Sequence, residues 1–198
     1  VYNFSYDAQN RLSAATVTGV SGGPITSSYL YNDQGIRVWA IANGTTKYFL
    51  TDLNNPTGYG QVLEELSTVG GTPTMSYVIG DDVLAQAASS TASYLLYDGH
   101  GSTRQLVSGT SCANQYNYDA YGQSLGTQPT FSSPPATTML YAGEQFDTAL
   151  QHYYLRARYY DPSNGRFNQL DPFAGNNFDP QSLHKYAYVA DDPVNGSD

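Results

Sequence analysis

The chain has 198 residues, a formal net charge of −9 at pH 7 and only 13% charged side chains. This balance excludes a nucleic-acid binder, because phosphate contacts need clustered Lys and Arg, and it equally disfavours an anionic membrane surface. No apolar run approaches the roughly 18 residues of a membrane span. The sequence opens without Met and stops at Asp198 inside a turn-like stretch, so we expect an excerpt or a processed product.

Tyrosine dominates the composition, with 19 Tyr beside 19 Gly and 10 Pro. Tyr fits a pleated, half-buried surface, and frequent Gly and Pro indicate many turns. The composition therefore predicts an all-β protein. The single cysteine, Cys112, cannot form an internal disulfide or a Cys-rich metal site, and we expect it to be a small buried side chain.

Tyrosines followed by Asp or Asn recur along the chain at intervals close to multiples of about 21 residues. They are Tyr6, Tyr31, Tyr97, Tyr118 and Tyr160, with degenerate copies at Tyr48, Tyr77 and Tyr141. Each unit predicts a hairpin, because Asp and Asn bond their own backbone and Gly accepts positive φ. In "YDAQNRL" and "YDGHGSTRQL" the Asp can cap the turn while the Arg stem lies over a Tyr ring.

Hairpins of this size cannot bury a face alone, so neighbouring units must pair into one elongated sheet. The recurring tyrosines are then most simply a packing ladder between successive hairpins, although a sugar-binding or partner-binding surface is the alternative.

In chain order, residues 1–122 are predicted to be repeat hairpins. They include 60–69, which we interpret as strand with a turn despite its helix-like sequence. The Pro, Ser and Thr of 123–138 predict a loop. A denser segment then occupies 139–198, and within it 146–155 is interpreted as strand, turn and strand.

Tyr-Asp turns of this period resemble the RHS/YD-repeat family. "EQFDTALQHYYLRARYYDPSNGRFNQLDP" is similar to the opening of the RHS-associated core of that family, and "HKYAYVADDPVNGSD" is similar to its close. The resemblance implies a large bacterial secreted or cell-surface protein, such as a polymorphic toxin. It also implies that the hairpins form an extended, curved β-shell around a C-terminal cargo and that the core plugs the end of the shell.

In this family, self-cleavage is attributed to three motif residues, which correspond here to Arg158, Asp171 and Asp198. Two close carboxylates cannot both ionise cheaply, so one can act as an acid while the other activates water, and an Arg can hold the ionised member. The scissile bond lies beyond this sequence, so cleavage is expected only of the parent protein. The alternative role of Arg158 is to pair with an acid in a buried turn.

Other candidate sites are weaker. Asp161 is expected to initiate a turn and to pair structurally with Arg166 across it. His100 lies near Ser102 and Asp98, yet all three fall in one tight turn, which favours a turn residue over a catalytic triad.

Two acidic pairs, at 80–82 and 191–192, lack an EF-hand loop, so they indicate at most a weak surface Ca²⁺ site. The histidines form no short-range cluster. We therefore expect no metal and no cofactor.

The leading hypothesis is a structural container segment with its closing plug, whose partners are an enclosed cargo polypeptide or neighbouring shell segments. An intramolecular aspartyl-type protease is the second hypothesis. The third is an extracellular filament-forming or adhesion module, because open strand edges template pairing with other chains and the Tyr-rich face suits glycans.

Overall fold

Strands account for nearly all regular structure in the computed structural model, which describes residues 1–126 and 133–196. The first eleven strands are β1 Tyr2–Tyr6, β2 Leu12–Val17, β3 Ile25–Tyr31, β4 Arg37–Ala42, β5 Thr45–Asp52, β6 Gln61–Leu66, β7 Pro73–Ile79, β8 Val83–Ala88, β9 Thr91–Tyr97, β10 Thr103–Ser108 and β11 Ser111–Gln115. Four shorter strands follow: β12 Gln145–Asp147, β13 His152–Leu155, β14 Arg158–Asp161 and β15 Arg166–Phe167. In the described ranges the helical segments are three short 3₁₀ turns: η1 Tyr141–Gly143, η2 Pro180–Leu183 and η3 Val189–Asp191. The predicted all-β class is confirmed.

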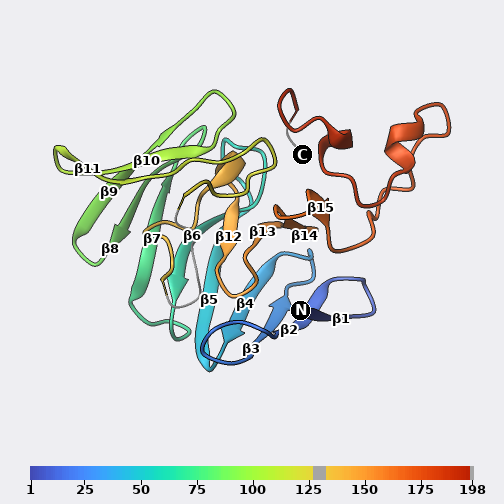
Figure 1. Ribbon diagram of the computed structural model, residues 1–198. Helices are drawn as coiled ribbons and strands as arrows, with labels where there is room; N and C mark the ends of the chain where they lie inside the picture. The colour runs from blue at the N-terminus through green and yellow to red at the C-terminus, as the bar shows by residue number, and fades with distance from the viewer. Residues whose placement is uncertain (127–132, 197–198) are drawn as a thin grey trace.

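The first eleven strands form one sheet in sequence order, and each strand pairs antiparallel with its neighbours. This is the topology that a run of hairpins produces. The sheet curves as it proceeds, so that β1 and β11 stand at the two ends of an arc (Figure 1). The segment 60–69, interpreted as strand, contains β6.

Four Tyr-Asp or Tyr-Asn turns share one hydrogen-bond pattern. The carboxylate of Asp7 accepts the backbone N–H groups two and four positions later, both at 2.9 Å. The side chains of Asn32, Asp98 and Asp119 make the same pair of contacts. The third residue after the cap has positive φ in every case, which only Gly and Asn adopt readily. These residues are Asn10, Gly35, Gly101 and Gly122.

Two arginines connect a capped turn to the next hairpin. Arg11 donates from Nε to the Asp carboxylate of its own turn at 2.7 Å, and its guanidinium lies 5.0 Å from the Tyr31 ring centroid. Arg104 makes the equivalent ion pair at 2.7 Å and lies 5.5 Å from the Tyr118 ring. The predicted placement of an Arg stem over a Tyr ring is confirmed.

Three of the repeat tyrosines also hydrogen-bond to the preceding hairpin. Each hydroxyl donates to a backbone carbonyl at the start of an earlier strand. The pairs are Tyr31 to Leu12 at 2.8 Å, Tyr97 to Val83 at 2.6 Å and Tyr118 to Thr103 at 3.0 Å. These three bonds link successive units, as the predicted ladder requires, whereas the Tyr6 and Tyr160 hydroxyls donate to the carbonyls of Asn168 and Tyr121.

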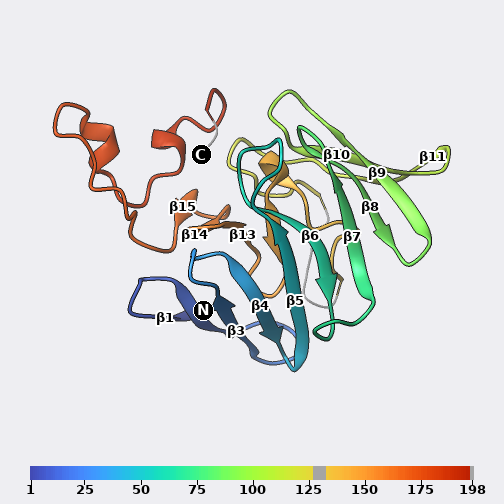
Figure 2. The same cartoon turned by 180° about the vertical axis from the view of Figure 1, so that it is seen from behind.

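The last four strands form a separate small antiparallel sheet, also in sequence order. The segment 146–155, interpreted as strand, turn and strand, supplies part of β12 and all of β13. The small sheet lies inside the arc of the large sheet, as both views show (Figures 1 and 2).

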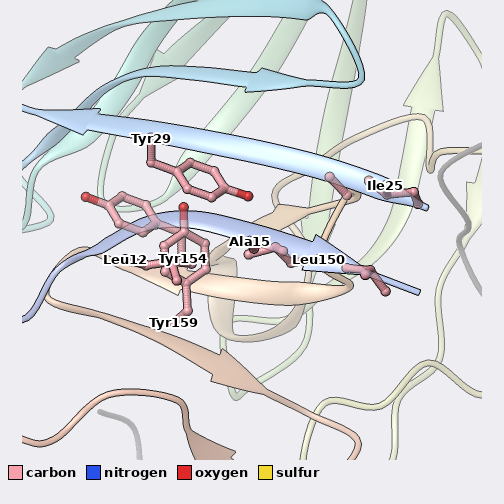
Figure 3. Packing of buried hydrophobic residues seen from close by; sticks show 9 residues of the cluster. Leu12, Ala15, Ile25, Tyr29, Leu150, Tyr154 and Tyr159 are labelled. Atoms are coloured by element: carbon pink, nitrogen blue, oxygen red, sulfur yellow. The ribbon is translucent and has the colours of Figure 1, made fainter. Parts of the chain in front are cut away.

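The main core forms where the small sheet meets β2 and β3. Leu12 and Leu150 are completely buried there, and Tyr29 packs against Tyr159 with ring centroids 5.4 Å apart (Figure 3). A second cluster extends along β5 to β10 and includes Met139. The concave face of the large sheet is therefore a buried surface, and aliphatic and aromatic side chains hold the small sheet against it.

The structure can be compared with the sequence-based expectations for the cysteine, the predicted loop and a membrane span. Cys112 is exposed on β11, an edge strand, so the expectation of a buried thiol was wrong. Part of the predicted loop, residues 127–132, lies outside the described residues. Within the described ranges, no helix has both the length and the apolar character needed to cross a membrane.

Candidate functional site

The structure brings together two of the three residues assigned to self-cleavage. Arg158 begins β14, and Asp171 lies in the segment that follows β15. Arg158 Nη1 and Asp171 Oδ2 are 2.8 Å apart, which makes a charge-assisted contact. The third residue, Asp198, lies outside the described residues.

This ion pair is held on several sides. The Arg158 guanidinium lies 3.6 Å from the Phe167 ring centroid, and its Nη1 donates to the Lys185 carbonyl at 3.4 Å. The same carbonyl accepts the Asp171 N–H at 3.1 Å. Asp171 Oδ1 accepts the N–H of Phe173 at 2.8 Å. The Asp171 carboxylate is therefore fixed in position, and its side chain remains 26% exposed, so water can reach it.

Asp161 opens a turn, as predicted, but its carboxylate does not pair with Arg166. The two residues are direct neighbours in the β14–β15 register, yet Arg166 is exposed. The Asp161 carboxylate instead accepts the backbone N–H and hydroxyl of Ser163, at 2.9 and 2.6 Å, and the amide of Asn164 at 2.9 Å. The short turn satisfies this carboxylate locally, and the expected Asp161–Arg166 pair was wrong.

His152 lies behind the same turn and is almost completely buried. Its Nε2 is 3.7 Å from Asp161 Oδ2, and its ring contacts Tyr2 and Phe4 of the edge strand β1. Burial lowers the pKa of His152, and the Asp161 charge opposes that shift only in part. The neutral imidazole therefore packs β1 against the small sheet.

The turn containing His100 is structural, as predicted. The Asp98 carboxylate accepts the backbone N–H groups of His100 and Ser102, and the Ser102 hydroxyl accepts the N–H of Ala142 at 3.0 Å. None of these bonds links the imidazole to the hydroxyl or the carboxylate, so the geometry is not that of a triad. In the part of the chain that the structure describes, no group of three His, Cys, Asp or Glu side chains could hold a metal ion.

A buried arginine that the sequence did not single out joins the two sheets. Arg37 is 3% exposed, and its Nη1 contacts Asp147 Oδ2 at 3.2 Å and the Tyr159 hydroxyl at 2.7 Å. Its Nη2 donates to the Gln145 side-chain oxygen at 2.5 Å, and its backbone N–H donates to the Tyr154 hydroxyl at 2.8 Å. One arginine of the large sheet thus binds three strands of the small sheet.

A second polar group extends this network along β6. Glu65 is 3% exposed, and its carboxylate binds Lys47 Nζ at 2.6 Å, the Tyr77 hydroxyl at 3.1 Å and the Gln145 amide at 3.3 Å. Gln145 therefore bridges Arg37 and Glu65. Buried charges of this kind are retained only where each is paired and hydrogen-bonded.

The spacing between Arg37 and the capping residue of its turn could have predicted that its side chain faces the buried side of the sheet. Side chains alternate between the two faces of a strand, so a shift of one residue reverses the face. Arg11 and Arg104 stand four and six positions after their capping Asp and reach its carboxylate. Arg37 stands five positions after Asn32, as Leu12 does after Asp7, and both Arg37 and Leu12 are buried.

The comparisons with known proteins match nearly the whole chain. It is 31% identical over 197 residues to tRNA3(Ser)-specific nuclease WapA of Bacillus spizizenii and 31% identical over 199 residues to tRNA nuclease WapA of Bacillus subtilis strain 168. Each match covers 98% of this chain and 8% of the relative. Salivary gland surface protein 1 of Aedes aegypti is 34% identical over 105 residues, which is 52% of this chain and 3% of that protein. No protein-family model matches.

Solved structures share the fold. The chain superposes over its full length on part of the TcdB2-TccC3 crystal structure, with a TM-score of 0.68 and 19% identity. The match to the Photorhabdus luminescens Tc holotoxin pore carrying TccC3-D651A has a TM-score of 0.66 and 18% identity. The chain corresponds to 10% of the matched chain in each structure, and at this identity the likeness concerns the fold alone.

Proposed function

We propose that this chain belongs to the RHS/YD-repeat family and forms a segment of a hollow β-shell together with the plug that closes it. The parent is a large bacterial protein, secreted or displayed at the cell surface, that encloses a C-terminal toxin or other cargo polypeptide. The function is steric and needs no cofactor, because a continuous wall keeps proteases away from what it surrounds.

The observation that carries the proposal is the arrangement of the two sheets. Eleven strands pair without interruption into a curved wall, and the small sheet fills its concave side (Figure 2). Repeat tyrosines bond one hairpin to the next, so the wall can be extended unit by unit. The similarity to a small part of much longer WapA proteins, and to a small part of a TccC3-containing chain, fits a segment of a larger container.

Protease protection in the parent protein tests the container function. We expect closed hollow particles by negative-stain microscopy and a C-terminal segment that survives limited proteolysis. Tyr160→Ala should expose that segment, because Tyr160 is fully buried in the small sheet and stacks on Tyr188 with centroids 4.1 Å apart. Tyr94→Ala is the matched control, since Tyr94 is 54% exposed on β9.

Two results would contradict the proposal. One is a C-terminal segment that is digested equally fast in the unmodified protein and in Tyr160→Ala. The other is a preparation of uniform fibres, which would favour assembly of the chain through its open strand edges.

Self-cleavage of the parent protein is the second candidate function, and the Arg158–Asp171 pair favours it. The carboxylate is fixed by the guanidinium and by a backbone N–H, and it remains accessible to water. In this hypothesis Asp171 and Asp198 share the acid and base roles in hydrolysis of one peptide bond. Arg158 holds Asp171 in place, so it acts as a positioning residue.

The test expresses the chain with its natural C-terminal extension and follows the products by mass spectrometry. We expect two fragments from the unmodified protein, and one full-length product from Asp171→Asn. Asp179→Asn is the control, because Asp179 is exposed and stands outside the proposed site. A full-length product from the unmodified protein, or equal cleavage in Asp171→Asn, would rule out this mechanism.

A further inference from the structure

The segment 170–186 carries a group of exposed apolar side chains. It follows β15, contains η2 and lies on the β1 side of the molecule, away from β7 to β11 (Figures 1 and 2). Phe178 is 97% exposed and Phe173 is 60% exposed. The other large apolar side chains of the segment are exposed too, and they are Leu170, Leu183 and Tyr186. Apolar groups gathered in this way mark a surface that another polypeptide covers.

Hydrogen bonds within the segment fix the shape in which these side chains are presented. The Ser182 hydroxyl accepts the N–H of Asn176 at 2.7 Å. The Phe178 N–H donates to the Asn176 side-chain oxygen at 3.0 Å. The Lys185 ammonium donates to the Phe173 carbonyl and so joins the two ends of the segment. Phe178 is therefore presented by a closed, preformed loop, and docking such a loop costs little conformational entropy.

The first hairpin of the large sheet holds the beginning of this segment. The Tyr6 hydroxyl donates to the Asn168 carbonyl at 2.9 Å, and the Asn10 side-chain amide donates to the Leu170 carbonyl at 3.2 Å. Within the described residues β1 pairs only with β2, so its second edge is open to a further strand. A strand added there would extend the large sheet on the side where the segment lies (Figure 1).

Strands added to β1 by the same repeat pattern would present apolar side chains on their inner face. Tyr29, Phe49, Tyr77 and Leu106 occupy inner positions of the large sheet, and all four are buried by residues of 139–159. A hairpin that precedes β1 needs an equivalent cover, which the exposed side chains of 170–186 can supply. The charge of this segment does not oppose burial, because residues 172–184 contain a single charged side chain, that of Asp179.

We propose that segment 170–186 docks on the inner face of the repeat hairpin that precedes β1 in the parent protein. Phe178 is the anchor of this contact, and Phe173 and Leu183 pack around it against apolar side chains of that hairpin. The small sheet is then held on two sides, because Arg37 already binds it to β4. The inference rests on the proposed container function, since it requires a longer repeat wall.

Hydrogen exchange in the parent protein and in this chain tests the contact. The amides of 173–184 should exchange with little protection in this chain. In the parent protein their exchange should be slower by roughly 10- to 100-fold, which corresponds to the burial of one Phe side chain. Phe178→Ser in the parent protein should restore the fast exchange. Val69→Ser is the matched control and should leave the protection unchanged, because Val69 is 78% exposed between β6 and β7.

The amides of β1 separate this contact from the container function. Slower exchange of β1 in the parent protein than in this chain shows that a further strand is added to its edge. Protection of β1 without protection of 173–184 overturns the docking of the segment and leaves the container proposal intact. Fast exchange of both regions in the parent protein overturns both proposals.

The remaining outcomes concern the variant and other occupants. Unchanged exchange in β5 and β6 establishes that Phe178→Ser is folded, and the docking is overturned if this variant keeps the protection of 173–184. It is also overturned if removal of the C-terminal cargo abolishes that protection, because the cargo then covers the segment. Analytical ultracentrifugation of this chain tests a second copy, and a dimer that Phe178→Ser dissociates would assign the surface to self-association.

Discussion

Arg–Asp pairs stabilise both the large repeat sheet and the small C-terminal sheet, but the paired residues are close in the chain in one case and far apart in the other. In the large sheet, Arg11 and Arg104 bind an Asp in their own hairpin, four and six positions away. The small sheet is instead held by distant partners, since Arg37 and Asp147 are 110 positions apart. The large sheet is thus specified locally, unit by unit, whereas the attachment of the small sheet depends on contacts between segments far apart in the chain.

Replacing Arg37 should cause the largest loss of stability among the variants that test this comparison. Arg37→Met removes the cation paired with Asp147 Oδ2 and the donor to the buried Gln145 side-chain oxygen, so we expect a loss of roughly 3–5 kcal/mol in the free energy of unfolding. Arg11→Met breaks a partly exposed pair within one turn and should cost less than about 1 kcal/mol. Urea denaturation of both variants measures the contrast, and equal losses would show that the two regions are not held differently.

Two glycines in equivalent turns give the next test. Gly35 has φ +79° with nothing within 4 Å of an added Cβ, so Gly35→Ala should cost only backbone strain, about 1–2 kcal/mol. Gly122 has φ +83°, and an added Cβ would stand 2.5 Å from the Tyr141 ring. Gly122→Ala should therefore cost about 1–3 kcal/mol more, from the overlap with the Tyr141 ring. Equal thermal and urea stabilities of the two variants would contradict this.

Removing a turn cap should have a smaller effect. Asp98→Ala leaves two backbone N–H groups and Arg104 without their acceptor, and it should cost about 1–2 kcal/mol because the site is partly exposed. Asp33→Ala is the matched control, since Asp33 is an exposed residue of another repeat turn. Hydrogen exchange should show faster opening near 98–102 in the Asp98 variant alone; protection unchanged from the unmodified chain would mean that the cap is not needed.

The smallest expected effect is a pH dependence with a different origin in each sheet. The pKa of His152 is lowered from 6.5, so the unfolded chain gains a proton before the folded chain does, and stability falls as pH drops below 6.5. Burial would raise the pKa of Asp98, but hydrogen bonds from Ser102 and His100 and the contact with Arg104 lower it from 3.8. Its contribution is therefore present above pH 3.8 and is lost below it.

Chemical denaturation across pH 3 to 8 separates the two windows. His152→Phe should remove the change below pH 6.5, and Asp98→Asn should reduce the change below pH 3.8, to which Asp7 also contributes because its pKa is lowered too. If His152→Phe retains the upper transition, another group must be responsible for it.

The sequence predicted the large sheet of hairpins but not Arg37, which binds the small sheet to it. Asp7 and Asp98 could be recognised because every bond that they make falls within a few residues. The same reasoning from neighbouring residues was wrong for Asp161, because its carboxylate accepts hydrogen bonds from Ser163 and Asn164 and does not pair with Arg166. Cys112 was expected to be buried, yet it lies on the edge strand β11, and its exposure depends on where the sheet ends.

The candidate site shows the same division. The motif residues Arg158 and Asp171 were named from the sequence, and the structure places them in contact at 2.8 Å. The Arg37 network could not be named, because it arises only when the small sheet packs against β4 to β6.

The sequence by itself determined the all-β class, the hairpin order and the capped Tyr-Asp turns, because each of these depends on hydrogen bonds between residues that are close in the chain. Only the tertiary structure decided which face of the large sheet is buried and which polar groups hold the small sheet against it. Such contacts depend on the curvature of eleven paired strands and on packing between distant segments, which no local pattern encodes.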